Sequence, residues 1–304
     1  MTTNTSHTQL ARTDVYTRVT AKIIADLEQG VRTWQRPWNA DHAAGNIIRP
    51  RRANGLPYRG VNVLLLWSEA LDKGYTAPMW MTYKQAETLG AQVRKGEHGS
   101  LVVYADKFTK TETDDQGKEA ERQIAFMKGY TVFNVEQIDG LPAHYTAKAE
   151  PAQPVQRIDQ AEAFFAAAGV TIRHGGNRAF YAPSLDFIQL PPRESFRDAE
   201  SYCATLAHEE IHATSHPSRL NRELGKRFGD QAYAAEELIA EMGSAFLCAD
   251  LGITPEVRDD HAAYLAHWLK VLKADNRAIF TAASQAQRAA DFLHQVTTPE
   301  DVAA

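Results

Sequence analysis

The start of the chain carries apolar residues at the spacing of one helix face. In residues 13 to 30 an apolar residue recurs at about every fourth position, as in Val15, Val19, Ile23 and Leu27. Thr13 is positioned to cap such a helix, and Gly30 is positioned to end it. The pattern predicts an amphipathic helix that buries its apolar face.

Two later segments have the composition of β-strands. Residues 100 to 110 (SLVVYADKFTK) and 123 to 138 (QIAFMKGYTVFNVEQI) are rich in β-branched and aromatic residues. The acidic stretch from 111 to 121 lies between them and is typical of a solvated hairpin tip. We therefore predict that the two segments pair. With the first helix and a short helix around 61 to 74, they form a compact α+β domain in residues 1 to 140.

A second domain is expected after a linker. Residues 141 to 156 contain Pro and Ala with little periodicity, which is typical of a connection between domains. Residues 157 to 304 open with a helix and continue with two short extended segments around a Gly-Gly turn. Three helical stretches follow, at 198 to 215, 231 to 252 and 259 to 296. The order predicts a small sheet covered by helices, so the fold class is α+β throughout.

Composition is that of an ordinary globular protein. A length of 304 residues with 44% hydrophobic content is sufficient for two domains that each bury a core. No apolar run approaches the roughly 18 residues that span a bilayer, and the N-terminus lacks the apolar segment of a secretory signal. Cys203 and Cys248 stand in apolar helical contexts, so we interpret both as core residues. We expect a cytoplasmic protein.

Charge is distributed unevenly between the two halves. Residues 1 to 140 carry 18 Lys and Arg against 16 Asp and Glu, a net charge of +2. The remaining residues carry 15 against 22, a net charge of -7. This asymmetry favours two separate roles, with a polyanion more easily accepted by the N-terminal half.

The sequence HEEIH at 208 to 212 has the spacing of a metal-binding helix. Residues four apart lie on one helix face, so His208 and His212 can offer two imidazoles to one ion. Glu209, beside the first histidine, is then placed to act as the general base of a zinc-dependent hydrolase. An apolar stripe leads into the motif, and Pro217 ends the helix beyond it. We predict a catalytic site for one Zn²⁺, with Mn²⁺ or another divalent ion as an alternative.

A third ligand is expected on the following helix. Glu237 and Glu241 stand four apart in a mostly apolar stretch, where carboxylates are costly to bury without a cation. We assign Glu237 as the ligand and Glu241 as the acceptor that orients a ligand imidazole. The pattern leaves open the exchange of these two roles. Glu236 is expected to face solvent, and His216 is a poorer candidate because Pro217 follows it.

The loop between these two helices is basic. Arg219, Arg222, Lys226 and Arg227 are interpreted as ordinary surface residues, although they can also rim a cleft for an acidic ligand. Tyr233 is either a packed aromatic residue or a group that stabilises an oxyanion.

The N-terminal half mixes aromatic and basic residues in a way that suits unpaired nucleic acid. Aromatic faces stack single-stranded bases while cations follow the phosphates. The alternative is that the aromatic residues form the core of a small domain. The candidate DNA-binding residues are Arg36, Trp38, Arg49, Arg51, Arg52, Tyr58, Arg59, Trp80, Tyr83, Lys84, Arg94 and Lys95.

Longer motifs resemble a known family. Residues 58 to 67 (YRGVNVLLLW), 80 to 99 and 129 to 142 resemble the N-terminal domain of the plasmid antirestriction protein ArdC, a domain shared with conjugative-plasmid primases. Residues 208 to 222 and 233 to 241 resemble the zincin-like peptidase domain that accompanies it. The resemblance covers roughly residues 10 to 295. It implies a single-strand DNA-binding domain joined to a metal-binding domain, with ligands at His208, His212 and Glu237 and the general base at Glu209.

Three functions are compatible with these features. The first is an antirestriction protein that binds single-stranded DNA, protects incoming plasmid DNA and acts on, or binds, a host restriction-system protein through its metalloprotease-type domain. The second is a dedicated metalloprotease whose N-terminal domain recognises a protein substrate. The third is a non-enzymatic DNA-coating protein with a structural metal. No membrane partner is expected.

Overall fold

The computed structural model describes residues 14–30, 34, 48–113, 119–146, 154–222, 231–254 and 261–298. Over these residues the helices are α1 (Val15–Glu28), α2 (Val61–Lys73), α3 (Tyr83–Thr88), α4 (Ala143–Thr146), α5 (Pro154–Ala167), α6 (Ala199–Ala213), α7 (Gln231–Leu251), α8 (His261–Ala274) and α9 (Ala278–Thr297). The strands are β1 (Arg51–Arg52), β2 (Met79–Met81), β3 (Gln92–Val93), β4 (Ser100–Thr113), β5 (Glu119–Asn134), β6 (Ile138–Asp139), β7 (Thr171–His174), β8 (Phe180–Ala182) and β9 (Phe187–Leu190). Short 3-10 helices are η1 (Val135–Gln137) and η2 (Arg193–Ser195).

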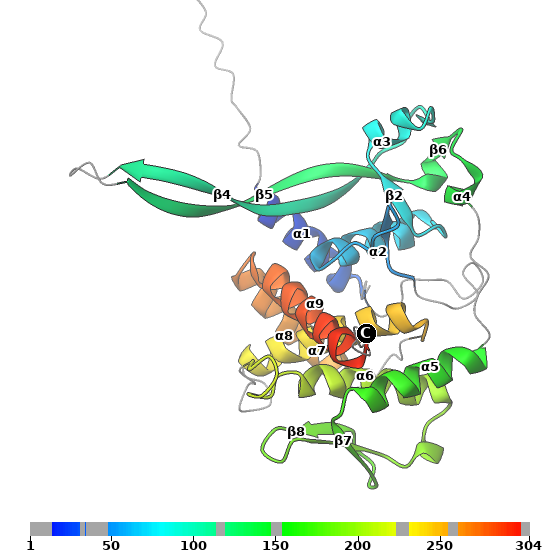
Figure 1. Cartoon of the computed structure of the whole chain (residues 1–304), viewed down its shortest axis with the longest axis vertical. Helices are drawn as coiled ribbons and strands as arrows, with labels where there is room; N and C mark the ends of the chain where they lie inside the picture. Colours follow the sequence, from blue (N-terminus) through cyan, green and yellow to red (C-terminus); the bar gives the residue numbers. More distant parts are fainter. Residues whose placement is uncertain are drawn as a thin grey trace, which may run out of the picture.

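A four-stranded sheet organises the N-terminal half. Its order is β1-β2-β5-β4, with β1 parallel to β2 and the other pairs antiparallel. Beyond the sheet, β4 and β5 continue together as a long twisted arm that projects from the body of the molecule (Figure 1). The predicted pairing of the two strand segments is confirmed. The tip predicted at 111 to 121 lies partly outside the described residues.

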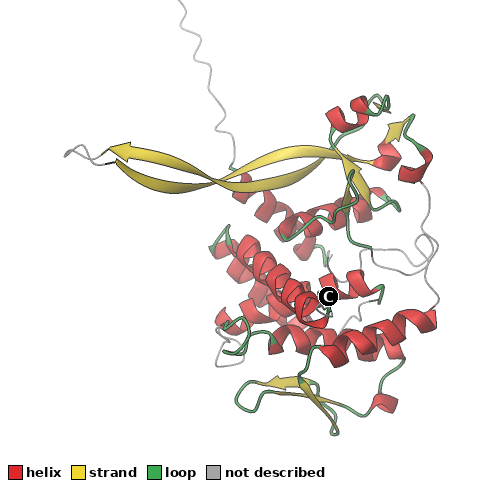
Figure 2. Ribbon diagram, in the orientation of Figure 1, coloured by secondary structure: helices red, strands yellow, loops and turns green. Residues whose placement is uncertain are grey.

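The C-terminal half places a small sheet beside a layer of helices (Figure 2). The sheet has the order β7-β9-β8, with β7 parallel and β8 antiparallel to β9. The second predicted extended segment therefore holds two strands, because the chain turns between Ala182 and Phe187. The last predicted helical stretch is likewise divided into α8 and α9 by a break around Asn276.

The first helix is capped by a different residue from the one expected. The side chain of Asp14 accepts a hydrogen bond from the backbone N–H of Tyr16 at 2.6 Å, so Asp14 and not Thr13 is the N-cap. The helix ends as predicted, since Gly30 has a φ of 75°, which glycine adopts without strain. Thr13 itself lies outside the described residues.

One apolar cluster runs through both halves. Helix α1 packs on α8, and α2 packs on α9. Trp67 on α2 lies against Phe246 on α7, with ring centroids 6.0 Å apart, and Trp34 meets Trp268 at 5.9 Å. All four side chains are at most 1% exposed. The N-terminal half therefore buries a large part of its apolar surface against the C-terminal helices. The domain limits at 140 and 157 stay a prediction; α4 and the start of α5 fall within the proposed linker.

A polar network also joins the halves. Arg49 donates from Nη1 to Gln287 Oε1 at 2.9 Å and from Nη2 to Asp250 Oδ2 at 3.0 Å. Its guanidinium carbon lies 4.5 Å from the centroid of the Phe246 ring. Gln287 Oε1 accepts a second hydrogen bond from the backbone N–H of Gly60. Arg49 is only 4% exposed, so it fastens the segment before α2 to α7 and α9.

Cys203 and Cys248 are both free and fully buried, which confirms their prediction as core residues. Among the described residues, no helix combines the length and the apolar character required to cross a bilayer.

Candidate metal centre

Helix α6 carries the HEEIH motif into the core. Asp198 caps the helix by accepting from Ser201 N at 2.7 Å, and the apolar stripe of Tyr202, Cys203 and Leu206 is buried. This anchoring fixes the direction in which the next two turns point. His208 is 5% exposed, and the side chain of His212 is 12% exposed. Both imidazoles face α7.

A glycine allows the two helices to approach closely. A Cβ at Gly243 on α7 would lie 2.9–3.0 Å from three side-chain carbons of Ile211 on α6. Such contacts are shorter than carbon atoms tolerate, so only glycine permits this separation of α6 and α7. The close approach brings carboxylates of α7 within reach of the two histidines of α6.

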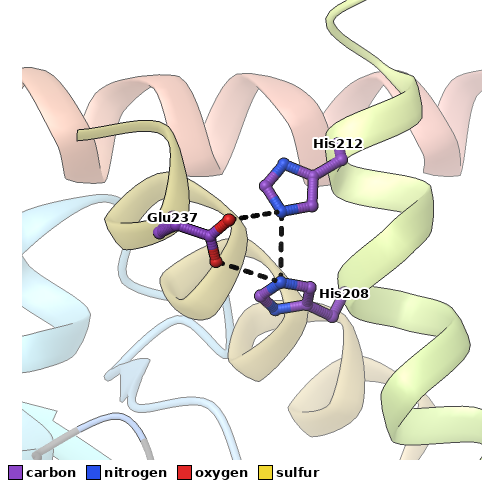
Figure 3. Close-up of side chains that lie close together, drawn as sticks. All are labelled: His208, His212 and Glu237. Carbon is purple, nitrogen blue, oxygen red and sulfur yellow. Dashed lines mark hydrogen bonds and ion pairs between the residues drawn. The ribbon is translucent and has the colours of Figure 1, made fainter. Parts of the chain in front are cut away.

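Three ligand atoms converge between the helices, as Figure 3 shows. His208 Nε2 and His212 Nε2 are 3.1 Å apart. Glu237 Oε2 lies 3.6 Å from His208 Nε2, and Glu237 Oε1 lies 3.6 Å from His212 Nε2. All three residues offer ligand atoms within 4.8 Å of one another, the one such group among the described residues. Side chains that are 29 positions apart along the sequence thus meet at one point.

This donor set fits a divalent ion. Ligand atoms around a tetrahedral zinc lie roughly 3.3 Å apart, given metal–ligand bonds of about 2.0–2.1 Å. The observed separations of 3.1 and 3.6 Å are close to that value. Two imidazoles and one carboxylate also match the ligand type of catalytic zinc sites, which keep a fourth position open.

Two further carboxylates turn the histidines toward this point. Glu241 Oε1 lies 3.6 Å from His208 Nδ1, and Glu236 Oε1 lies 3.3 Å from His212 Nδ1. A proton held on Nδ1 by a carboxylate leaves Nε2 with its lone pair free for a metal. The expectation that Glu236 faces solvent is wrong, because this residue is 4% exposed and interacts with His212.

Arg222 holds Glu236 in place. It donates from Nη2 to Glu236 Oε1 at 2.7 Å and from Nε to Glu236 Oε2 at 3.2 Å. It also donates to Thr214 Oγ1 and to the carbonyl of Ile211, at 2.6 and 2.7 Å. Its side chain is 6% exposed, so the interpretation of Arg222 as a surface residue is wrong. One arginine thus ties the end of α6 to a carboxylate of α7.

Arg219 is likewise committed within the protein. It donates to the carbonyl of Ala213 at 2.7 Å and forms an ion pair with Asp186, which also accepts a hydrogen bond from the hydroxyl of Tyr181. The segment after α6 is therefore anchored to the turn between β8 and β9. Lys226 and Arg227 lie outside the described residues.

The electrostatics of the cluster favour ionised groups. Burial raises the pKa of Glu237, but a hydrogen bond from His208 and the charges of His212 and His208 outweigh it and lower the pKa to about 2. Burial lowers the pKa of His212, yet Glu236, Glu237 and Glu209 raise it to about 9. The surplus of negative charge around the imidazoles is an environment that a divalent cation would neutralise.

Neighbouring groups complete the centre. Glu209 is 3% exposed and its charge acts on His212. Tyr233 forms a hydrogen bond with Glu237, so it is a polar neighbour of the centre as well as a packed residue. His216 points elsewhere, with Nδ1 2.7 Å from Ser218 Oγ, and does not join the cluster. The roles of Glu209 and of the three candidate ligands stay predictions.

Glu210 differs from its neighbours in the motif. It is fully buried, and neither carboxyl oxygen has a hydrogen-bond partner. Burial raises its pKa to about 8. The folded protein therefore favours the protonated form of this side chain near neutral pH.

The candidate DNA-binding residues divide by exposure. Tyr58 and Trp80 are 3% and 1% exposed and pack in the core, and Arg49 is committed to Asp250 and Gln287. The structure does not support these three residues as DNA contacts, because side chains that are buried and already paired or packed offer no surface to DNA. The exposed candidates are Arg51, Arg52, Arg59, Tyr83, Lys84, Arg94 and Lys95. Arg36 and Trp38 lie outside the described residues.

Two of the exposed candidates form ion pairs within the protein. Arg59 is paired with Asp291 on α9, and Arg94 donates to Glu97 at 2.7 Å. Their charges are thus partly neutralised, whereas Arg51 and Arg52 are exposed beside one another on β1, at the edge of the four-stranded sheet.

No pattern along the chain indicated the interaction between Glu236 and Arg222 in the metal centre. The one hint was the position of Glu236 next to Glu237.

Two histidines and a carboxylate on adjacent helices, next to a small sheet, define a zincin-like domain. Residues 159–285 match the family model described as zincin-like metallopeptidase. Residues 13–133 match the model for the N-terminal domain of the anti-restriction factor ArdC. The chain belongs to the ArdC antirestriction family. The resemblance and the α+β fold class inferred from sequence are confirmed.

Relatives share nearly the full length of the chain. An uncharacterised protein of Sinorhizobium fredii, y4eC, is 47% identical over 296 residues, 95% of this chain and 94% of its own length. A metal-free crystal structure of the antirestriction ArdC protein from plasmid R388 is 47% identical with a TM-score of 0.78, covering 94% of this chain and 98% of that chain. Its Mn(II)-bound structure has a TM-score of 0.77. A DNA primase TraC of Escherichia coli is 41% identical over 91% of this chain, which spans only 26% of the primase.

Proposed function

We propose that this protein binds single-stranded DNA, protects incoming plasmid DNA from host restriction and carries a metal-dependent, peptidase-type site. The likeness to ArdC of plasmid R388 over almost the whole of both chains supports the antirestriction role. The convergence of His208, His212 and Glu237 carries the hydrolase half of the proposal. A relative bound to Mn(II) supports a divalent ion, and zinc is the ion that the ligand set favours.

The residues of the centre divide the chemistry of hydrolysis among them. A divalent ion held there supplies Lewis acidity, which polarises a carbonyl group and lowers the pKa of water. His208, His212 and Glu237 hold the ion, while Glu241 and Glu236 keep the imidazoles turned toward it. Glu209 accepts the proton of the attacking water and passes it to the leaving amine.

Metal analysis tests the centre. The wild type is expected to bind one divalent ion per chain, and His212→Ala is expected to lose it. His216→Ala is the matched control, because this histidine interacts with Ser218 away from the cluster and its removal should leave the metal content unchanged. Equal metal content in wild type and His212→Ala would contradict the proposed ligand set.

DNA binding is supported by the homology to DNA primases and by the exposed arginines on β1. Affinity of the full chain for single strands is expected to fall steeply with salt, because cations released from DNA drive such binding. Salt-independent or absent binding would favour a dedicated metalloprotease whose N-terminal half recognises protein.

The Glu209→Ala variant distinguishes a catalytic role in antirestriction from simple coating of DNA. This variant keeps the three candidate ligands and is expected to retain metal and DNA affinity. If hydrolysis serves antirestriction, the variant fails to protect plasmid DNA entering a restricting host. Full protection by a variant that still holds metal would indicate a DNA-coating protein with a structural ion.

A further inference from the structure

One face of the β4–β5 arm carries exposed aromatic rings. Side chains along a strand alternate between the two faces of a sheet. The register therefore puts three cross-strand pairs on the same face: Val102 with Tyr130, Tyr104 with Lys128, and Asp106 with Phe126. Tyr104 is 51% exposed and Tyr130 is 36% exposed, so both rings reach solvent. We call this surface the aromatic face of the arm.

The rings on this face are held in fixed orientations. The hydroxyl of Tyr104 donates to Asp106, and the hydroxyl of Tyr130 is hydrogen-bonded to that of the buried Tyr58. The centroids of Tyr104 and Phe126 are 6.1 Å apart in an edge-to-face arrangement. Since the polar ends are satisfied within the protein, the exposed ring faces are already ordered, and little side-chain entropy is lost on binding.

The root of the arm is rigid. Asn62 on α2 donates to the carbonyl of Val103 and accepts from its backbone N–H, both at 2.8 Å. The opposite face of β5 lies against α1, where a Cβ at Gly129 would be 3.5 Å from Val15. These contacts fix the direction in which the arm projects from the body (Figure 1). On the aromatic face Val102 is buried, whereas the rings of Tyr130 and Tyr104 reach solvent.

Cations flank the rings. Lys128 Nζ lies 5.2 Å from the centroid of Phe126, and the guanidinium of Arg52 lies 5.5 Å from the ring of Tyr58. Arg51 is exposed beside Arg52. The single carboxylate among the three cross-strand pairs, Asp106, is occupied by the Tyr104 hydroxyl. The surface thus combines stacking faces with positive charge, which complements a flexible polyanion that has exposed bases.

The spacing of the rings also fits unpaired bases. Successive positions on one face of a strand are about 6.8 Å apart. Bases stacked along one strand are about 3.4 Å apart, so a ring inserted between two bases separates them by about 6.8 Å. Tyr130, Tyr104 and Phe126 occupy three successive levels at this interval. In duplex DNA the base faces are covered by their neighbours and cannot stack on these rings.

We propose that single-stranded DNA lies along the aromatic face, with bases stacked on Tyr130, Tyr104 and Phe126 and phosphates near Lys128 and Arg52. This inference rests on the proposed single-strand binding and assigns a surface to it.

Fluorescence anisotropy of the full chain with a labelled oligothymidylate tests the assignment. Tyr104→Ala and Tyr130→Ala are each expected to weaken binding about 5- to 150-fold, which corresponds to stacking of about 1–3 kcal/mol per base. Tyr104→Phe keeps the ring and is expected to bind within about 2-fold of wild type. Lys128→Ala is expected to reduce the salt slope by about 0.7.

Two controls separate the surface from general effects. Thr131→Ala alters the opposite face of the arm, and Phe180→Ala removes a ring that is 39% exposed in the C-terminal half; neither is expected to change affinity. Photocrosslinking of wild type to bromodeoxyuridine-containing single strands is expected to label Tyr104 or Tyr130, and it does not depend on any variant folding.

Four outcomes would overturn the assignment. If wild type fails to bind single strands, both the proposed function and this inference fail. If wild type binds but Tyr104→Ala and Tyr130→Ala bind equally well, or the crosslinks map only outside the arm, the inference alone fails. Equal losses of affinity for a blunt duplex would show that the rings do not read unpaired bases.

Discussion

Replacing Arg49 with alanine measures how strongly the polar network joins the two halves. The change removes a side chain that is 4% exposed, together with one hydrogen bond to Gln287 and the ion pair with Asp250. Loss of one member of a buried charge pair costs about 3–5 kcal/mol. Asp250 keeps 24% of its side-chain surface exposed and lies 3.0 Å from His294 Nε2, so solvent and the imidazole offset part of that cost. We expect a loss of about 3 kcal/mol.

Thermal unfolding followed by circular dichroism is the assay. In a chain of this size, 1 kcal/mol shifts Tm by about 2 °C, so Arg49→Ala should unfold about 6 °C below wild type. Arg51→Ala is the matched control, because this neighbouring arginine is exposed and its loss should shift Tm by less than about 1 °C. Combining Arg49→Ala with Asp250→Asn removes both charges without restoring the packing and is expected to recover part of the loss.

An Arg49→Ala variant with the Tm of wild type but a lower affinity for single-stranded DNA would contradict this structural role. The Arg49 side chain would then contact nucleic acid. The combined variant distinguishes a charge effect from a packing effect on Phe246, since only the former is relieved by neutralising Asp250.

Three further changes probe the centre and its supports. In Gly243→Val the new side chain should clash with Ile211, which should lower the free energy of unfolding by about 1–3 kcal/mol in a denaturant titration and weaken metal affinity. Adding Ile211→Ala should restore metal affinity. Wild-type metal affinity in Gly243→Val would show that the spacing of α6 and α7 does not matter for the centre. Glu236→Gln should lower metal affinity about 10- to 100-fold by calorimetry, whereas an unchanged affinity would mean that the contact with His212 does not orient it. The pKa of Glu210 is about 8 in the folded protein, above its ordinary value of 4.5. Between these values the folded state binds the proton more tightly than the unfolded state, so the free energy of unfolding is highest below pH 4.5 and falls as pH rises toward 8. Glu210→Gln should therefore be more stable than wild type by on the order of 3 kcal/mol at pH 7 and should show a flatter pH profile; parallel profiles would count against a buried, neutral carboxyl.

The centre was accessible to prediction because its signals are local. Two histidines one turn apart share a face on any helix, so the placement of His208 and His212 follows from helix geometry alone. Glu237 was chosen because carboxylates in an apolar helix need a cation, and the structure brings it to both histidines. The choice between Glu237 and Glu241 depends on how α7 is rotated against α6. The close contact of Gly243 with Ile211, which no pattern along the chain reveals, constrains that rotation.

The errors arose where a residue type has two uses. Arginine beside aromatic residues is typical of a nucleic-acid surface, yet Arg49 lies over Phe246 inside the protein, because its partners come from positions more than 200 residues away. Glu236 and Arg222 had the composition of a solvated face and instead neutralise each other in the core. Alternation along β4 and β5 predicted paired strands, but it did not show which face α1 would leave open.

The apolar cluster shared by both halves limits how this protein can be divided or inherited. Separating the chain near residue 150 would expose the Trp67 side of α2 and the Phe246 side of α7 to water, so each fragment would be prone to aggregate. A gene that encoded only one half would produce an aggregation-prone protein, which is a physical reason for the two regions to be inherited together. Their joint presence within the much longer TraC primase is consistent with transfer as one block.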